Sequence, residues 1–430
     1  MAPIIAERID VTSSTPPSIT SSSSRLKGKR AAMVTFSPFP YDPRPRRAIE
    51  ALVEQGMQVD LICLKDGNSP RRETLHGIDV VRVPLTHRRG SKVAYAYEYA
   101  LFIFISSIIF AWRSLIRGYD LVYVHNMPDI LILSALIPKA LGAKVVLDLH
   151  DPMPELMTTI FNLDKDSFSV RLISRIEKWS IARANSVVTP NLAFKRIFGS
   201  RSCSPDKIEV VMNSPDGGIF PFSAPRESAT QIRSERFVIM YHGSLVERNG
   251  LDLAVEALAQ VRQAIPGAEL HIYGSSTPFL EQVMETARNK DLKNAVRYLG
   301  PRRLEDLVPE IEKCDVGVVP NHRNRFTELN MPTRIFEYLS LGKPVIAPRT
   351  SGIQDYFGEE SLMFFEAGDP DDLAHAIKYV FDHPTEVNEV VRRGQNVYEK
   401  HAWHKERMRL ISVVDRLVHK ETTELSSVIP

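Results

Sequence analysis

The segment RFTELNMPTRIFEYLSLGKPVIAP, residues 325–348, carries groups that could bind a nucleotide. Its pattern predicts a helix at 333–341 between strands at 316–320 and 344–347. The first turn of a helix offers unpaired N–H groups to a phosphate, at the sheet edge where open parallel sheets bind ligands. Glu337, one turn into this helix, could accept both hydroxyl groups of a ribose. The alternative is a surface glutamate on an amphipathic helix.

A second candidate site is LDLHDPMPEL, where His150 and Asp151 directly follow an apolar run at 144–149. A histidine after a strand is often structural, and a histidine between carboxylates such as Asp148 could also be a metal ligand. From the residues alone, catalytic, structural and metal-binding roles all stay open for His150.

A third candidate site is the loop YHGSLVERNG at the end of the apolar run at 237–242. Gly243 lets the backbone come close to a diphosphate, and Gly250 opens the next helix. The loop between them carries Arg248, a cation that could pair with a phosphate through charge-assisted hydrogen bonds. The alternative is a solvated arginine that pairs with Glu247.

The elements that must position these residues form two series of alternating strands and helices. Each series predicts a parallel sheet with helices on both faces. Between them, residues 214–236 are rich in Pro, Gly and Ser without periodicity, so we predict a linker there. The β-rich runs lie at 31–36, 58–64, 80–83, 121–125, 144–149, 186–189 and 208–212, and then at 237–242, 269–273, 296–299, 316–320, 344–347 and 363–365.

A chain of 430 residues is long enough for two such domains, each with its own core. We therefore predict an N-terminal Rossmann-like domain at 29–213 and a C-terminal one at 237–400, followed by a helix at 401–420. Residues 1–28 and 421–430 are predicted to be tails. The first tail is rich in Ser, Thr and Pro, lacks the apolar segment of a secretory signal, and is predicted to be disordered.

The sequence resembles the retaining family 4 glycosyltransferases of GT-B fold. EYLSLGKPVIAP is similar to the second half of their Glu-x7-Glu signature, with Glu337 as the second Glu and Leu329 in place of the first. NMPTRIFEY matches the Pro-Thr/Ser-Lys/Arg-x-x-Glu-Tyr variant of this signature, with Arg334 as its basic residue. The resemblance covers nearly all of the chain after the first tail. It implies an α/β fold with two Rossmann-like doubly wound domains facing a central cleft, and a final helix that crosses back to the first domain.

The resemblance also implies roles for the candidate residues. His150 and Asp151 match an Asp-x-His-Asp-x-x-Pro-Glu segment whose histidine points at the transferred sugar, and Arg248 would neutralise the leaving diphosphate. Asp42 and Arg44, in the proline-rich loop SPFPYDPRPRR, would lie near the donor phosphate and the acceptor; the alternative is a helix cap with a paired arginine. The other positions expected to line the donor site are Gly243, Ser244, Gly274, Gly300, Arg334, Glu337 and Gly352.

The implied reaction is sugar transfer from a UDP- or GDP-type nucleotide sugar to a glycan or lipid-linked acceptor, with retention of configuration. Neither a cofactor nor a metal is expected. Cys63, Cys203 and Cys314 lack the spacing of a zinc site or of a disulfide framework, which suits a reducing cytoplasm. The net charge of +2 argues neither for nor against nucleic acid, and we expect none as a partner.

Two other classes of protein stay open. A metal-dependent GT-A glycosyltransferase needs an Asp-x-Asp motif at a strand end, and the only plain case, at 164–166, opens a polar stretch where capping residues are expected. A GT-B scaffold that binds a sugar nucleotide without turnover is motivated by Leu329, and by Ser244 and Asn249 at two positions that can be basic in the family.

The run YALFIFISSIIFAW at 99–112 is apolar except for two serines. These fourteen residues are too few to span a bilayer and too apolar all round for a surface helix. One interpretation is a buried core helix; the other is a helix in the membrane interface. We favour the second, which predicts a cytoplasmic protein that is peripheral on the inner face of the membrane. The basic residues that flank the run are Arg82, Arg88, Arg89, Lys92, Arg113 and Arg117.

Overall fold

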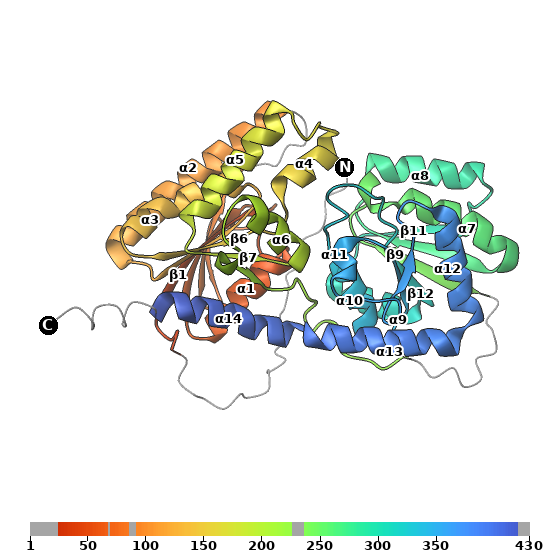
Figure 1. Ribbon diagram of the computed structural model, residues 1–430. Helices are drawn as coiled ribbons and strands as arrows, with labels where there is room; N and C mark the ends of the chain where they lie inside the picture. The colour runs from red at the N-terminus through yellow and green to blue at the C-terminus, as the bar shows by residue number, and fades with distance from the viewer. Residues whose placement is uncertain (1–24, 68, 86–91, 226–235, 420–430) are drawn as a thin grey trace.

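The computed structural model describes residues 25–67, 69–85, 92–225 and 236–419 (Figure 1). These residues form two α/β domains, each built on one sheet, with a pair of helices from the end of the chain running along both (Figure 1). The strands predicted from the sequence are all present, and their ends agree within two residues.

The N-terminal domain contains an eight-stranded sheet with the order β3-β4-β2-β1-β5-β6-β7-β8. Neighbouring strands are parallel except β3, which pairs antiparallel with β4. The sequence analysis misses β3 because its four residues, RETL, are too few to show a pattern. The strands are β1 (Arg30–Pro38), β2 (Gln58–Leu64), β3 (Arg72–Leu75), β4 (Ile78–Val83), β5 (Leu121–His125), β6 (Lys144–Asp148), β7 (Ser186–Thr189) and β8 (Ile208–Val210).

Both faces of this sheet are covered, since alternate residues of β1 enter different apolar clusters. Ala32 and Val34 share a cluster with residues of α2, α5 and α6, whereas Ala31 and Met33 share one with residues of α1 and α14. Strands buried on both faces read as continuous apolar runs, which explains why the sequence predicts them well. The helices are α1 (Pro43–Glu54), α2 (Lys92–Arg117), η1 (Asp129–Ala135), α3 (Leu136–Ala140), α4 (Met153–Phe161), α5 (Phe168–Arg183), α6 (Leu192–Arg201), η2 (Pro205–Lys207) and α14 (Trp403–His419).

The C-terminal domain contains a six-stranded parallel sheet with the order β11-β10-β9-β12-β13-β14. Its strands are β9 (Phe237–His242), β10 (Ala268–Tyr273), β11 (Val296–Gly300), β12 (Val316–Val318), β13 (Val345–Pro348) and β14 (Met363–Phe365). Its helices are η3 (Glu247–Asn249), α7 (Leu251–Ala264), α8 (Pro278–Asn289), α9 (Leu304–Lys313), α10 (Thr333–Ser340), α11 (Ser351–Gln354), α12 (Pro370–Asp382) and α13 (Pro384–Lys400).

The predicted domain boundaries need two corrections. Leu26 is only 1% exposed and packs in the N-terminal core, so the first domain includes residues that we assigned to the tail. Phe220 of the predicted linker packs into the core of the C-terminal domain. At the end of the chain, α13 leads into α14, which buries Leu410 and Val414 against the N-terminal domain (Figure 1). The rest of the predicted tails and linker, 1–24, 226–235 and 420–430, lies outside the described residues.

The apolar run at 99–112 is part of α2, which has 26 residues instead of the expected fourteen. Among the described residues, α2 is the one helix long and apolar enough to cross a membrane, judged by length and composition alone. Phe102 and Phe110 are fully buried in the domain, and the Phe102 ring meets Phe36 edge to face. Phe104 and Ile108 are 63% and 52% exposed. The helix therefore has one face in the core and one apolar face outside, a mixture of our two interpretations.

The basic residues around α2 are less available to lipid than the sequence suggests. Arg82 and Arg113 are buried, and each forms an ion pair inside the domain, Arg113 with Asp60 at 3.0 Å. Arg117 is about half exposed and lies 3.9 Å from the same carboxylate. Arg88, Arg89 and the side chain of Lys92 lie outside the described part of the chain.

Candidate active site

Asp148, the last residue of β6, is the centre of a buried polar cluster. Arg44 in the first turn of α1 donates to both of its oxygens, with 2.7 Å between Nη2 and Oδ1, and the Tyr123 hydroxyl donates at 3.0 Å. Parallel pairing sets His125 of β5 opposite Asp148. Burial alone would raise the pKa of Asp148, but Arg44 and the two histidines, His125 and His150, hold it far below its usual range. Asp148 therefore stays ionised inside the domain.

The loop before α1 shows the helix cap that we gave as the alternative. The Asp42 carboxylate accepts from the backbone N–H of Arg44 at 3.3 Å. The Arg44 guanidinium does not pair with Asp42; besides Asp148 it donates to the carbonyl oxygen of Val211 at 3.1 Å. Arg44 therefore binds groups within the N-terminal domain and holds Asp148 in place. Contact of Asp42 with the sugar donor or the acceptor stays a prediction.

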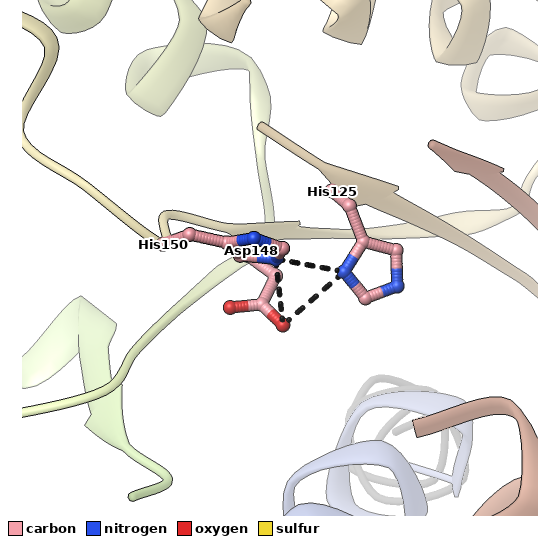
Figure 2. A group of neighbouring side chains, drawn as sticks. All are labelled: His125, Asp148 and His150. Carbon is pink, nitrogen blue, oxygen red and sulfur yellow. Dashed lines mark hydrogen bonds and ion pairs between the residues drawn. The ribbon is translucent and has the colours of Figure 1, made fainter. Parts of the chain in front are cut away.

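His150 and Asp151 follow β6 directly and are held by Asn126, the residue after β5. Asn126 accepts from the backbone N–H of His150 at 2.7 Å and donates to the carbonyl oxygen of Asp151 at 3.1 Å. The His150 ring turns toward His125, with 3.0 Å between Nε2 and Nδ1 (Figure 2). Burial lowers the pKa of His150 to about 4, so its ring is neutral at neutral pH.

In the C-terminal domain, the loops after β9 and β10 approach so closely that only glycine fits. A Cβ atom on Gly274 would lie 2.2 Å from the carbonyl oxygen of Gly243. At Gly250, which precedes α7 with a φ of 67°, a Cβ atom would lie 1.8 Å from the Pro320 carbonyl oxygen. Gly243 and Ser244 are both exposed at the carboxyl edge of the sheet. The Gly243 amide already donates to the Tyr273 carbonyl oxygen at 3.0 Å, so contact of Gly243 and Ser244 with a diphosphate stays a prediction.

Helix α10 brings Arg334 and Glu337 to the same edge. Arg334 donates to the carbonyl oxygen of His242 at 2.8 Å, and its guanidinium lies 4.9 Å from the centre of the Tyr241 ring. Glu337 is only 8% exposed, and its Oε2 lies 2.6 Å from Nε2 of His242. The alternative interpretation of Glu337 as a surface residue is therefore wrong. The other ring nitrogen of His242 contacts the Tyr338 hydroxyl at 2.9 Å.

Arg248 of the C-terminal domain and Asp151 of the N-terminal domain each affect the pKa of the other. Burial raises the pKa of Asp151 to about 6, and the charge of Arg248 opposes that rise. Burial likewise lowers the pKa of Arg248, and Asp151 opposes that shift. The Arg248 guanidinium lies 5.8 Å from the centre of the Phe326 ring. The described residues contain no ion pair between Arg248 and Glu247, so the solvated-pair alternative is not observed.

The two remaining predicted glycines, Gly352 and Gly300, both form backbone hydrogen bonds within the C-terminal domain. The amide of Gly352 donates to the Glu328 carbonyl oxygen at 2.9 Å, and the amide of Ser351 donates to a Glu328 carboxylate oxygen at 3.0 Å. Both amides already have internal acceptors, so the predicted contact of Gly352 with a phosphate or sugar oxygen is not supported. Gly300 ends β11 with a φ of 78°, and its carbonyl oxygen accepts from Gly274 at 3.1 Å.

His125, Asp148 and His150 form a group whose ligand-type atoms lie within 4.8 Å of one another. Such a group resembles a metal site, but the guanidinium of Arg44 contacts both oxygens of Asp148. A cation bound there would face that fixed positive charge and would compete for oxygens that are already hydrogen-bonded. We therefore interpret the group as a hydrogen-bonded cluster that orients His150.

The Asp-x-Asp motif at 164–166 forms a turn before α5. Asp164 accepts from the backbone N–H of Asp166 at 2.7 Å, and Ser167 caps the helix through the N–H of Val170. The motif thus forms a turn ahead of the helix, and the capping role that we expected there falls to Ser167 instead.

Residues 42–214 match the family described as "Glycosyl transferase 4-like domain", and residues 236–383 match the one described as "Glycosyl transferases group 1". The two matches cover most of the two α/β domains and include the candidate site residues of both. The chain belongs to the group 1 glycosyltransferases. The glycogen synthase of Mycobacterium tuberculosis (strain CDC 1551 / Oshkosh) is 23% identical to this glycosyltransferase over 230 residues, 52% of each chain. The chain thus spans about half the length of the curated relatives it matches.

Solved structures show the fold of the glycosyltransferase. Sucrose-phosphate synthase from Thermosynechococcus elongatus has a TM-score of 0.72 at 19% identity, over 91% of this chain and 100% of the other. Anabaena HepE, solved in complex with UDP-glucose, has a TM-score of 0.63 at 15% identity, over 93% of this chain and 100% of the other. At these identities the likeness concerns the fold, and the predicted GT-B architecture is confirmed.

The sequence analysis of the glycosyltransferase misses His125, Asn126 and His242. His125 and His242 are the last residues of β5 and β9, and Asn126 follows β5 directly. One signal could have found them, because the carboxyl ends of parallel strands meet at one edge and a polar residue there can reach its neighbours. Applied to every predicted strand, this rule selects both histidines along with Asp148.

Proposed function

We propose that this glycosyltransferase moves a sugar from a UDP- or GDP-type nucleotide sugar to a glycan or lipid-linked acceptor, with retention of configuration and without a metal. The observation that carries the proposal is that Phe326 of the C-terminal domain packs in the apolar cluster of the N-terminal domain, with the Arg248 guanidinium 5.8 Å from the centre of its ring. Arg248 thus lies where the two domains meet, which supports its predicted contact with the diphosphate of a donor bound between them. The UDP-glucose complex of Anabaena HepE supports a nucleotide-sugar donor.

In the proposed reaction, the bond between the sugar carbon and the diphosphate oxygen breaks, a bond to the acceptor oxygen forms, and the proton of the acceptor hydroxyl passes to the leaving diphosphate. Arg248 neutralises the charge that grows on the leaving diphosphate, and it does so in a partly buried position where charges interact strongly. His150 is neutral and orients the sugar by a hydrogen bond. Glu337 holds the ribose with the carboxylate oxygen that His242 leaves free.

A lipid-linked acceptor is favoured by the outer face of α2. Phe104, Ile108 and Trp112 are spaced by four residues and are 63%, 52% and 62% exposed, so they form one apolar stripe along the helix. Leu115 continues the stripe and is 72% exposed. Helices α2 and α5 lie on the outside of the N-terminal domain (Figure 1). We propose that this stripe, Phe104, Ile108, Trp112 and Leu115, rests in the interface of the inner membrane leaflet.

A panel of UDP- and GDP-sugars tests the donor first. A nucleotide sugar at 100 times its dissociation constant should stabilise the folded chain by about 2.7 kcal/mol, which a thermal unfolding assay detects. The donor found in this way is then incubated with glycan and lipid-linked acceptors, and the anomeric configuration of the product is read by NMR. Chelator should leave the rate unchanged. Absence of stabilisation by every nucleotide sugar of the panel, or transfer that stops with chelator, would contradict the proposal.

A further inference from the structure

His125 is buried at the end of β5 with only one of its ring nitrogens in contact with polar groups (Figure 2). Its Nδ1 lies 3.0 Å from Nε2 of His150 and 3.5 Å from Oδ2 of Asp148. Its Nε2 is buried and has no hydrogen-bond partner among the described residues. This one-sided contact restricts where the protons of the two histidines can lie.

A neutral imidazole has one N–H donor and one acceptor nitrogen, so the contact between the rings admits two arrangements. If His150 donates from Nε2, the proton of His125 must be on its own Nε2, which makes a buried N–H without an acceptor. The bare Nδ1 of His125 would then also face the ionised Asp148. If His125 donates from Nδ1, only an acceptor is left unpaired. The N–H then lies 3.5 Å from Oδ2 of Asp148, and the bare Nε2 of His150 lies further from that oxygen, at 3.8 Å.

The second arrangement is favoured for two reasons. Buried N–H groups without a partner are rarer in proteins than unpaired acceptors. The carboxylate of Asp148 also attracts an N–H and repels a lone pair at this distance. Arg44 keeps that carboxylate in place by donating to both of its oxygens.

We propose that His125 is a positioning residue that fixes His150 with its proton on Nδ1, so that His150 donates a hydrogen bond to the transferred sugar and does not act as a base. The contact with the sugar rests on the proposed function. The side chain of His150 is 16% exposed, and its Nδ1 has no partner among the described residues. This N–H is therefore available to a sugar oxygen, while Nε2 is occupied by His125.

Nitrogen-15 NMR of the imidazole rings in the full, unliganded chain tests the tautomers directly. His150 and His125 should both show a protonated Nδ1 and a bare Nε2 at neutral pH. The variants His150→Gln and His125→Asn identify the two sets of signals by their loss. A proton on Nε2 of His150 overturns the proposal. Because no donor is needed, this result is independent of whether the proposed sugar transfer is found.

Kinetics of two His125 variants test the consequence. An asparagine amide can replace the Nδ1–H donor, whereas leucine removes it at similar volume. His125→Leu should lower kcat about tenfold, equivalent to about 1.4 kcal/mol, with nucleotide affinity unchanged, and His125→Asn should restore most of the loss. A folded His125→Leu protein with wild-type kcat overturns the proposal. If His125→Leu does not fold, the kcat of His125→Asn and the ring NMR decide. A bare Nδ1 on His150 in the wild-type chain then overturns the proposal.

Discussion

Nε2 of His242 lies 2.6 Å from Oε2 of Glu337, and this contact ties the end of β9 to the helix α10. Tyr338, next to Glu337, occupies the other ring nitrogen and donates its own proton to the Met240 carbonyl oxygen at 2.9 Å. Among the described residues, Oε2 is the one side-chain oxygen of Glu337 with a hydrogen bond. The pair therefore holds the carboxylate in one orientation and leaves its second oxygen for a ribose hydroxyl.

Glu337→Ala should weaken nucleotide binding. A charge-assisted hydrogen bond to the ribose contributes about 1.5 to 3 kcal/mol, so the dissociation constant of UDP or GDP should rise about tenfold or more. Calorimetry with both nucleotides measures the change. Glu285→Ala, on the exposed side of α8, is the matched control and should bind as the wild type does. An unchanged dissociation constant for Glu337→Ala would remove Glu337 from the donor site.

His150→Ala and Arg248→Ala should act at different stages of the reaction. His150 positions the sugar, so its loss should lower kcat more than donor affinity. Arg248 faces a diphosphate that is charged before transfer and gains charge during it, so its loss should weaken donor binding and lower kcat. Steady-state kinetics and calorimetry separate the two effects. Two variants with equal loss of kcat and unaltered donor affinity would contradict these roles.

Arg44→Ala should destabilise the N-terminal domain strongly. It leaves the buried carboxylate of Asp148 without its main partner, and breaking a buried pair in this way costs about 3 to 5 kcal/mol. Arg46→Ala is the matched control, because Arg46 pairs with Glu50 one turn away at the surface, where such a pair contributes about 0.3 to 0.5 kcal/mol. Urea unfolding measures both. Equal midpoints for the two variants would show that Asp148 finds another partner.

Asp151 should make the stability of the chain depend on pH. Its pKa is about 6 in the folded chain against 3.8 in the reference state, so the folded chain binds more protons between these values. The free energy of unfolding should therefore fall as pH rises from about 4 to 6, by about 3 kcal/mol from this group.

The comparison of wild type with Asp151→Asn isolates this contribution, since the other titrating groups are the same in both chains. The free energy of unfolding of the wild type, relative to that of the variant, should be higher at pH 4 than at pH 7. Parallel pH profiles for the two proteins would mean that Asp151 titrates normally in the folded chain.

The apolar stripe on α2 should bind anionic vesicles. Replacing Phe104, Ile108 and Trp112 with serine should abolish vesicle binding with little change in thermal stability, because these side chains are exposed. Sedimentation with vesicles that contain anionic lipid measures binding. Salt should weaken it only slightly, since Arg82 and Arg113 are already paired inside the domain.

Two further variants serve as controls for the stripe. Phe222→Ser and Met408→Ser remove exposed apolar side chains elsewhere, 52% and 61% exposed, and should leave vesicle binding intact. Phe102→Ser should lower stability by several kcal/mol, about 3 to 5 for a buried phenylalanine, since its side chain lies in the core. Absence of vesicle binding by the wild-type chain would show that the stripe has another partner.

Local pattern in the sequence determined the two sheets, because strands buried on both faces are continuous apolar runs whichever partners they meet. It also determined which loops carry the site, since these follow directly after the strands. Family likeness selected His150 and Arg248 in these connections and Glu337 on the helix α10, and the structure puts them near the carboxyl edges of the two sheets.

The tertiary structure alone decided which residues form hydrogen bonds and ion pairs with one another. Sequence spacing offers Asp42, two residues away, as an alternative partner for Arg44, but Arg44 pairs with Asp148, which lies 104 residues further along the chain. The resemblance predicts that Gly352 lines the donor site, but its amide already donates to the Glu328 carbonyl oxygen. A hydrogen bond depends on distance and direction in space, and sequence spacing records neither once the chain has folded back on itself. The environment of α2 also depends on the tertiary structure. Its apolar sequence fits a core and a membrane equally, and only the packing of the domain decides which face is buried and which is exposed.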